Sequence, residues 1–122
     1  MIIGIGIDLV EIKRIEKACS KEHFVNRCFT KMEQELFHNN MRQAAGNYAV
    51  KEAVSKMFGT GVRGFSMDEI EVLRDELGKP TVSLYGKALE LAKQLTITDI
   101  HVSISNTGDL VTAIVVGENR KV

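Results

Sequence analysis

The chain has 122 residues, 44% of them hydrophobic and 26% charged, and its sixteen basic residues balance sixteen acidic ones. A net charge of zero excludes a general attraction to nucleic acid, and no apolar run approaches the ~20 residues that cross a bilayer. Two cysteines are too few for a disulfide framework, so we expect one compact cytoplasmic domain over residues 1–122 with no nucleic-acid or membrane partner.

The first half of the chain is predicted to hold one strand followed by helices. In residues 2–10, isoleucine and leucine at odd positions alternate with Gly4, Gly6 and Asp8, which is typical of a strand. Thr30 followed by Glu33 is a capping-box pattern and predicts a helix that begins at residue 31. Helices are expected at residues 11–20, 23–29, 31–39 and 42–58, the last one closed by the glycines at 59 and 61.

The second half is predicted to contain two hairpins and one helix. Residues 69–74 and 81–85 read as paired strands around a turn, residues 86–95 as a helix, and residues 101–105 and 110–116 as a closing hairpin. The order predicts an α+β fold, a single small domain with a mostly antiparallel sheet and helices packed on it.

Asp8 is the one charged residue inside the apolar first strand. A carboxylate buried there must be paired, used as a helix cap or bound to a cation, because an isolated buried charge is costly. One interpretation makes Asp8 the cap of the following helix. The other makes it part of a ligand site, with Gly4 and Gly6 on the same face leaving room for a close ligand.

The helix at residues 42–58 has an apolar side and a polar side. Lys51, Glu52, Ser55 and Lys56 fall together, joined by Tyr48, opposite an apolar arc. The simplest interpretation is a solvated face with a Glu52–Lys56 pair. The glycines at 59, 61 and 64 favour a second one, in which backbone N–H groups and lysines bind phosphates. Asp8 and Glu52 would then supply the one or two carboxylates that Mg²⁺ usually takes from a protein.

Five segments in order resemble the holo-acyl-carrier-protein synthases, the small phosphopantetheinyl transferases. They cover nearly the whole chain: Gly4-Ile5-Gly6-Ile7-Asp8-Leu9-Val10-Glu11-Ile12, Arg27-Cys28-Phe29-Thr30-Lys31, Tyr48-Ala49-Val50-Lys51-Glu52-Ala53-Val54-Ser55-Lys56 with Phe58-Gly59-Thr60-Gly61, Gly78-Lys79-Pro80, and His101-Val102-Ser103-Ile104-Ser105.

The resemblance implies that phosphopantetheine passes from coenzyme A to a serine of apo-acyl carrier protein, in fatty acid biosynthesis. Asp8 and Glu52 would hold Mg²⁺, and Lys56 would join them as a catalytic residue that contacts phosphate. Either Glu52 or a water on the metal would accept the serine proton. The residues implied for coenzyme A binding are Lys51, Ser55, Lys56, Gly59, Gly61, Lys79, Pro80, His101 and Ser103, although His101 could instead cap a hydrogen-bonding network.

The chain departs from the family pattern at two positions. Asn106 stands where the family usually has histidine, and Asn47 where it often has arginine. Asparagine cannot supply positive charge to a phosphate, so we expect an altered affinity for the nucleotide. Members of the family form homotrimers with active sites at the subunit contacts, and we expect the same here.

Residues 12–31 carry six basic residues and two glutamates. This is either an ordinary solvated stretch or, as the resemblance implies, the surface that docks an acidic carrier protein. The candidates for docking are Arg14 first, then Lys13, Lys17 and Lys21. Two other functions stay open: a coenzyme A- or nucleotide-binding module without catalysis, and a different magnesium-dependent phosphate enzyme such as a small phosphatase.

Overall fold

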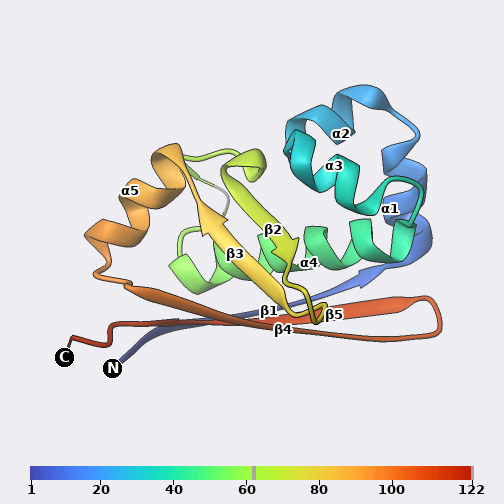
Figure 1. The fold of residues 1–122 in the computed structure, drawn as a ribbon. Helices are drawn as coiled ribbons and strands as arrows, with labels where there is room; N and C mark the ends of the chain where they lie inside the picture. The colour runs from blue at the N-terminus through green and yellow to red at the C-terminus, as the bar shows by residue number, and fades with distance from the viewer. Residues whose placement is uncertain (62, 122) are drawn as a thin grey trace.

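The computed structural model describes residues 1–61 and 63–121 and confirms the α+β prediction. A three-stranded sheet lies beneath the long helix α4, with a hairpin and the remaining helices above (Figure 1). The helices are α1 (Ile12–Cys19), α2 (Glu22–Cys28), α3 (Lys31–Phe37), α4 (Met41–Phe58) and α5 (Gly86–Gln94), with a 3₁₀ turn η1 (Met67–Glu69). The strands are β1 (Ile2–Glu11), β2 (Ile70–Arg74), β3 (Pro80–Leu84), β4 (Asp99–Thr107) and β5 (Leu110–Glu118).

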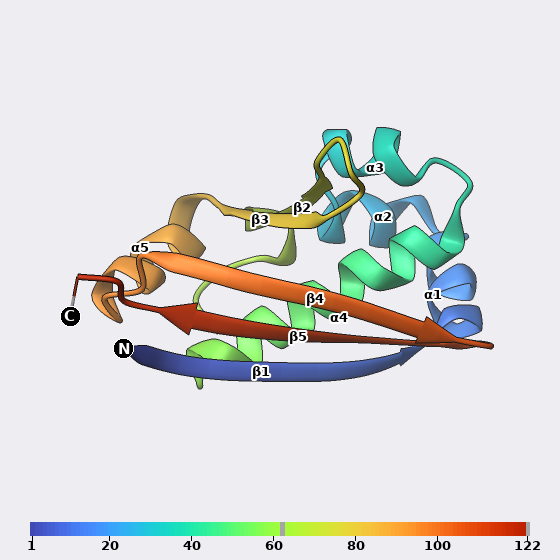
Figure 2. The ribbon, with the colours of Figure 1, turned by 60° about the horizontal axis from the view of Figure 1, so that its bottom comes forward.

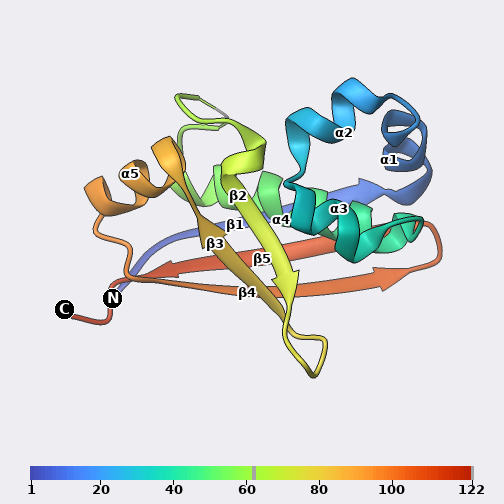
Figure 3. The same ribbon diagram turned by 45° about the horizontal axis from the view of Figure 1, so that its top comes forward.

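All strand pairs in the described chain are antiparallel. The large sheet has the order β1-β5-β4, so β1 and β4 form its two edges, and β2 pairs with β3 in a separate hairpin. Figure 2 shows the three strands side by side, and Figure 3 shows the hairpin crossing over the sheet, with α5 near one end and α1 to α3 near the other. No described helix is long and apolar enough to cross a membrane.

Helix α4 lies on one face of the sheet, and its approach explains the glycines of β1. A Cβ at Gly6 would stand 1.7 Å from the backbone oxygen of Ala53, and one at Gly4 would stand 2.4 Å from that of Met57. The glycines therefore make room for the backbone of α4 and not for a ligand, which corrects the sequence-based interpretation. The apolar arc of α4, including Ala53 and Met57, is buried as predicted.

The other face of the sheet is exposed in this chain. The strand alternation was predicted correctly, but Ile5, Ile7 and Leu9 point away from α4 and are 58–64% exposed. Across the sheet, Ile7 lies opposite Ile114, which in turn lies opposite Ser103. The outer face is therefore apolar along β1 and β5 and polar along β4.

Helix α3 begins as the capping-box pattern predicts. The Thr30 hydroxyl accepts a hydrogen bond from the Glu33 backbone N–H, and the Glu33 carboxylate accepts one from the Thr30 N–H. Helix α4 ends at Gly59, whose φ of 80° is in the left-handed region that favours glycine. These local signals explain why the boundaries of both helices were close to those expected.

Candidate functional site

The candidate site lies where β1 runs beside the C-terminal half of α4. The ammonium of Lys56 donates to a carboxylate oxygen of Asp8 and to the backbone oxygen of Ile7, each at 3.0 Å. The Asp8 side chain is 17% exposed and that of Lys56 54% exposed, so the pair is open to solvent on the lysine side. Asp8 is thus paired and not a helix cap, since α1 begins after Glu11.

Glu52 lies one helical turn before Lys56 and therefore on the same side of α4. Burial, followed by a hydrogen bond to Glu52 and the charge of Glu52, raises the pKa of Tyr48 to about 12. Tyr48 therefore stays protonated at neutral pH and acts as the donor to Glu52. Arg14 lowers the pKa of Tyr48 through its charge, which links α1 to this site.

Tyr48 is a site residue for which sequence reasoning gave no role, although it was recognised on the polar side of α4. Its ring packs against Phe24 of α2, with the ring centroids 5.9 Å apart. The signal that could have identified it is its spacing, since Tyr48, Glu52 and Lys56 follow at intervals of four residues.

Lys51 does not lie at the candidate site, contrary to the expectation that it binds coenzyme A. Its side chain is fully buried and pairs with Glu33 at 2.7 Å. The same ammonium donates to the backbone oxygens of Met67 and Ile70, so its three hydrogens are all used. Burial raises the pKa of Glu33 and lowers that of Lys51, while their mutual attraction opposes both shifts. This lysine joins α4 to the start of the β2–β3 hairpin.

Ser55 is also buried, and its hydroxyl donates to the backbone oxygen of Glu52 at 2.7 Å. The interpretation of a fully solvated polar face is therefore wrong for Lys51 and Ser55. Lys56 forms its ion pair with Asp8 and not with Glu52. Among the residues expected to bind coenzyme A, Lys56 remains at the site, and Gly59 and Gly61 come just after the last residue of α4, Phe58.

The other residues expected to bind coenzyme A lie elsewhere on the chain. Lys79 and Pro80 are in the β2–β3 turn, and Pro80 lines a cleft with Ile104 of β4. Since β1 and β4 are opposite edges of the sheet, α4 lies between that cleft and Asp8. His101 and Ser103 are on the outer sheet face, where His101 Nε2 lies 2.8 Å from a carboxylate oxygen of Glu118. His101 thus takes part in a polar pair, which agrees with the interpretation that it caps a hydrogen-bonding network.

The basic stretch forms a surface pocket of about 410 Å³ between α1 and α2. Arg14, Lys17 and Lys21 line it as the docking interpretation requires, and Phe24 and Arg27 complete it. Lys13 is not part of this lining, because its ammonium lies 3.4 Å from a carboxylate oxygen of Asp109. Lys13 and Arg14 are neighbours in sequence, but the periodicity of α1 places them on different sides of the helix.

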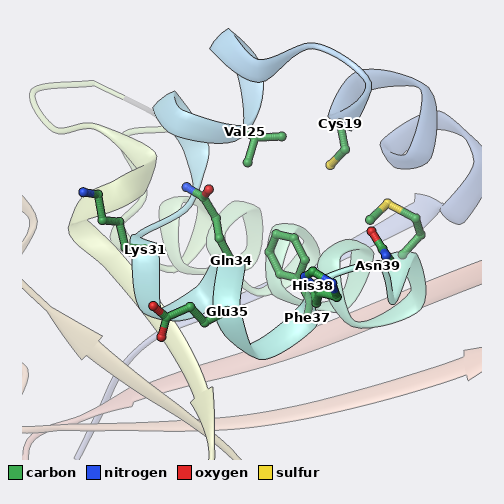
Figure 4. Close-up of a pocket in the computed structure, with 9 residues that line it drawn as sticks. Cys19, Val25, Lys31, Gln34, Glu35, Phe37, His38 and Asn39 are labelled. Carbon is green, nitrogen blue, oxygen red and sulfur yellow. The ribbon is translucent and has the colours of Figure 1, made fainter.

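A cavity of about 540 Å³ lies apart from Asp8, among α1, α2, α3 and the start of α4. Figure 4 shows Val25 and Cys19 above this cavity and Gln34, Phe37 and His38 below it. Within residues 1–61 and 63–121, no group of three or more His, Cys, Asp or Glu side chains lies close enough together to hold a metal ion. Asp8 and Glu52 are two carboxylates on one flank of α4, a donor set of hard oxygen atoms that suits magnesium.

Residues 4–115 match the family model of the 4'-phosphopantetheinyl transferase superfamily. A holo-[acyl-carrier-protein] synthase of Lachnoclostridium phytofermentans is 56% identical over 118 residues, which is 97% of each chain. The crystal structure of holo-[acyl-carrier-protein] synthase from Neisseria meningitidis superposes with a TM-score of 0.86 at 37% identity, covering 97% of this chain and 99% of that one. That of the Helicobacter pylori enzyme in complex with coenzyme A superposes with a TM-score of 0.83 at 31% identity, covering 93% and 99%.

Proposed function

The chain belongs to the 4'-phosphopantetheinyl transferase superfamily, and on that premise we propose that it transfers phosphopantetheine from coenzyme A to apo-acyl carrier protein. The serine oxygen of the carrier forms a bond to the β-phosphorus of the pyrophosphate. The bond from that phosphorus to the bridging oxygen breaks, adenosine 3',5'-bisphosphate leaves, and the serine proton passes to a base. The observation that carries the proposal is the Lys56–Asp8 pair beside Glu52, with the glycines of residues 59–61 next to it.

Lys56 is the cation of this chain that would bind the pyrophosphate. Its ammonium uses two hydrogens on Asp8 and the Ile7 carbonyl and is more than half exposed, so a third remains for a phosphate oxygen. This arrangement orients the lysine before substrate arrives, so the lysine can stabilise the transition state without first being reoriented. The Thr112 hydroxyl donates to the Asp8 carbonyl at 2.8 Å and fixes β1 at this point.

Asp8 and Glu52 would hold the magnesium ion, since both offer carboxylate oxygens and Lys56 alone does not balance two carboxylates and a pyrophosphate. The ion supplies neutralisation of the charge that develops on the transferring phosphoryl group. Tyr48 donates to Glu52 and so fixes the direction in which its carboxylate points.

The pocket between α1 and α2 is the surface that we assign to the carrier protein. Arg14, Lys17, Lys21 and Arg27 surround an apolar centre that includes Phe24. An acidic partner helix with an apolar side chain between its carboxylates would satisfy both parts of this pocket. The charge of Arg14 acts on Tyr48, and Tyr48 donates to Glu52, so this pocket lies near the proposed metal site.

We further propose a homotrimer in which two chains complete each site. The outer sheet face exposes isoleucines and a leucine, and such a patch favours burial against another copy. One chain has Asp8 and Lys56 on one flank of α4 and Lys79 and Pro80 on the other, so a neighbouring chain would bring the second set to the first. The holo-carrier product fits a cytoplasmic role in fatty acid biosynthesis.

The test is intact mass spectrometry of apo-acyl carrier protein after incubation with this protein, coenzyme A and Mg²⁺. We expect the carrier to gain one phosphopantetheine, and we expect EDTA to prevent the gain. Release of inorganic phosphate without a carrier product would point to the phosphatase alternative. Binding of coenzyme A with no change in carrier mass would point to the module without catalysis.

A further inference from the structure

The ring of Phe24 connects the pocket between α1 and α2 with helix α4. It lines that pocket together with Arg14 and Lys21. The same ring packs against Tyr48 of α4, with the ring centroids 5.9 Å apart and the ring planes inclined at 38°. Phe24 is half-buried, so part of its surface stays open to the pocket while another part contacts Tyr48. A side chain that enters the pocket therefore touches a ring that already packs against α4.

Tyr48 connects the ring of Phe24 with the proposed metal site. It lies one helical turn before Glu52, and its hydroxyl donates to the Glu52 carboxylate. Within residues 1–61 and 63–121, no lysine, arginine or histidine forms an ion pair with Glu52. The direction of this half-buried carboxylate therefore depends on Tyr48 and, through ring packing, on Phe24.

Arg14 adds an electrostatic connection between the same pocket and the same carboxylate. Burial and Glu52 raise the pKa of Tyr48, and the charge of Arg14 opposes that rise, so the guanidinium acts on the Tyr48–Glu52 pair. Among the residues that the structure describes, no carboxylate pairs with Arg14. An unbalanced cation at this distance also opposes a metal ion at Glu52, because like charges repel. A carboxylate of a docked partner that pairs with Arg14 would offset this repulsion.

A carboxylate that is already oriented binds a metal ion at a lower cost in conformational entropy. A free glutamate side chain loses rotamer freedom when it becomes a ligand, whereas a hydrogen-bond donor behind the ligand fixes its direction beforehand. Tyr48 is such a donor, and it is effective only while its own ring is held. An apolar side chain in the pocket would cover Phe24, restrict both rings and exclude water from the hydrogen bond, which strengthens it.

We propose that Phe24 and Tyr48 are positioning residues that couple docking of the carrier protein to binding of Mg²⁺ at Glu52, so that each ligand strengthens the other. This rests on the proposed function for the identity of the two ligands. Coupling of binding free energies is reciprocal, so the factor by which the carrier tightens the ion equals the factor by which the ion tightens the carrier. The metal site is thereby completed when the acceptor is in place.

The experiment measures the dissociation constant of a fluorescently labelled apo-carrier by anisotropy, at saturating Mg²⁺ and in EDTA at equal ionic strength. The acceptor serine of this carrier is replaced by alanine and coenzyme A is left out, so no transfer takes place. We expect the wild type to bind the carrier about fivefold more tightly with Mg²⁺. Calorimetric titration of Mg²⁺ with and without the carrier should give the same factor.

Three variants test the path of the coupling. Tyr48→Phe keeps the ring against Phe24 and removes the hydroxyl, so its carrier affinity in EDTA should equal that of the wild type while the gain with Mg²⁺ is lost. Phe24→Leu should weaken the carrier in both conditions and also lose the gain. The matched control is Phe65→Leu: Phe65 packs against Phe58 of α4 with centroids 5.6 Å apart, but does not line the pocket, and this variant should keep the full gain.

Equal carrier affinity of the wild type with and without Mg²⁺ would overturn the inference, and so would an undiminished gain in Tyr48→Phe. A purely structural role of Tyr48 would instead weaken the carrier in EDTA and with Mg²⁺ by the same factor, which also counts against the inference. Any effect of Mg²⁺ on the carrier alone is the same for every variant and cancels in the comparison. Thermal melting checks that Phe24→Leu folds, and Tyr48→Phe, which lacks a single hydroxyl, carries the test if it does not.

Intact mass spectrometry with the unmodified carrier separates this inference from the proposed function. Gain of phosphopantetheine by the carrier, together with docking that does not respond to Mg²⁺, would retain the function and overturn the coupling. Docking that depends on Mg²⁺ and on Tyr48, without any carrier product, would retain the coupling and overturn the function. A carrier that binds in neither condition would overturn both.

Discussion

Lys56 and Asp8 are 48 residues apart in the chain and form an ion pair of 3.0 Å between α4 and β1. The pair brings a cation and a carboxylate to the same point, with Glu52 one turn away on α4. This arrangement adds little to the stability of the fold, because an ion pair with an exposed partner contributes ~0–1 kcal/mol. The pair is better explained by a charged substrate that both residues serve.

Asp8→Asn should therefore remove activity without unfolding the protein. We expect carrier modification to slow by about a hundredfold or more, the scale observed when one electrostatic contact to a transition state is lost. The melting temperature should change little. The matched control is Asp109→Asn, which removes an exposed carboxylate from the ion pair with Lys13 and should keep full activity. Near-normal turnover of Asp8→Asn would remove Asp8 from the metal assignment.

The buried pair of Lys51 and Glu33 predicts a different outcome. Lys51→Met leaves a buried carboxylate uncompensated and should destabilise the fold by about 3–5 kcal/mol, measured by urea unfolding. Adding Glu33→Gln should restore part of that loss, since the unpaired charge is then gone. Lys17→Met, at an exposed position of α1, is the control and should stay within ~0.5 kcal/mol of the wild type. Two single losses that simply add would argue against direct coupling of the pair.

Lys51 and Lys56 show what the sequence can and cannot reveal about this chain. Helical periodicity assigns Lys51 and Lys56 to the same polar side of α4, and the capping pattern of Thr30 and Glu33 predicts where α3 begins. The periodicity contains no information about the turn η1 and the strand β2 that follows it, which supply one backbone acceptor each to Lys51. In residues 1–61 and 63–121 no such element covers Lys56, and its side chain is more than half exposed.

The faces of β1 were hidden from sequence for a similar reason. Alternation predicts a strand but does not say which face is buried, and the apolar residues ordinarily go inward. Here Gly6 goes inward because only a residue without Cβ lets α4 approach so closely, and Ile7 goes outward. The glycines of β1 lie against the backbone of α4, and the local sequence does not identify that neighbour.

Tyr48→Phe tests the link between α4 and Glu52. The pKa of Tyr48 is raised from 10.0 to about 12, so the unfolded chain loses this proton at a lower pH than the folded protein does. The stabilisation is present below pH 10 and is lost as the pH rises toward 12. The stability of the wild type relative to Tyr48→Phe should therefore decline over that range in urea titrations. At neutral pH the variant should be folded but slower, because Glu52 loses its donor. A constant stability difference between pH 9 and pH 12 would contradict the shift.

The docking surface predicts that Arg14 and Lys13 differ although they are neighbours in sequence. Arg14→Ala should raise the KM for the carrier about tenfold and leave the KM for coenzyme A unchanged, because Arg14 lines the pocket between α1 and α2. Lys13→Ala should have a much smaller effect, since Lys13 pairs with Asp109 and does not line that pocket. Added salt should reduce the difference between wild type and Arg14→Ala, because salt screens exposed charges. Equal effects of the two substitutions on the carrier would mean that general basicity, and not this pocket, attracts it.

The exposed sheet face predicts the assembly. Ile7 is 58% exposed and lies opposite Ile114, which is 42% exposed, at the centre of the apolar strip of β1 and β5. Ile7→Asp should leave the chain folded, because the side chain contacts solvent in the single chain, but should prevent association, because a carboxylate there would be buried without a partner. Light scattering should give three times the mass of one chain for the wild type and the mass of one chain for the variant. Met32→Asp is the control: Met32 is 57% exposed on α3, away from this face. If two chains share each site, Ile7→Asp should also lose carrier modification while still binding the carrier protein. A variant that is monomeric and fully active would show that one chain contains the whole site.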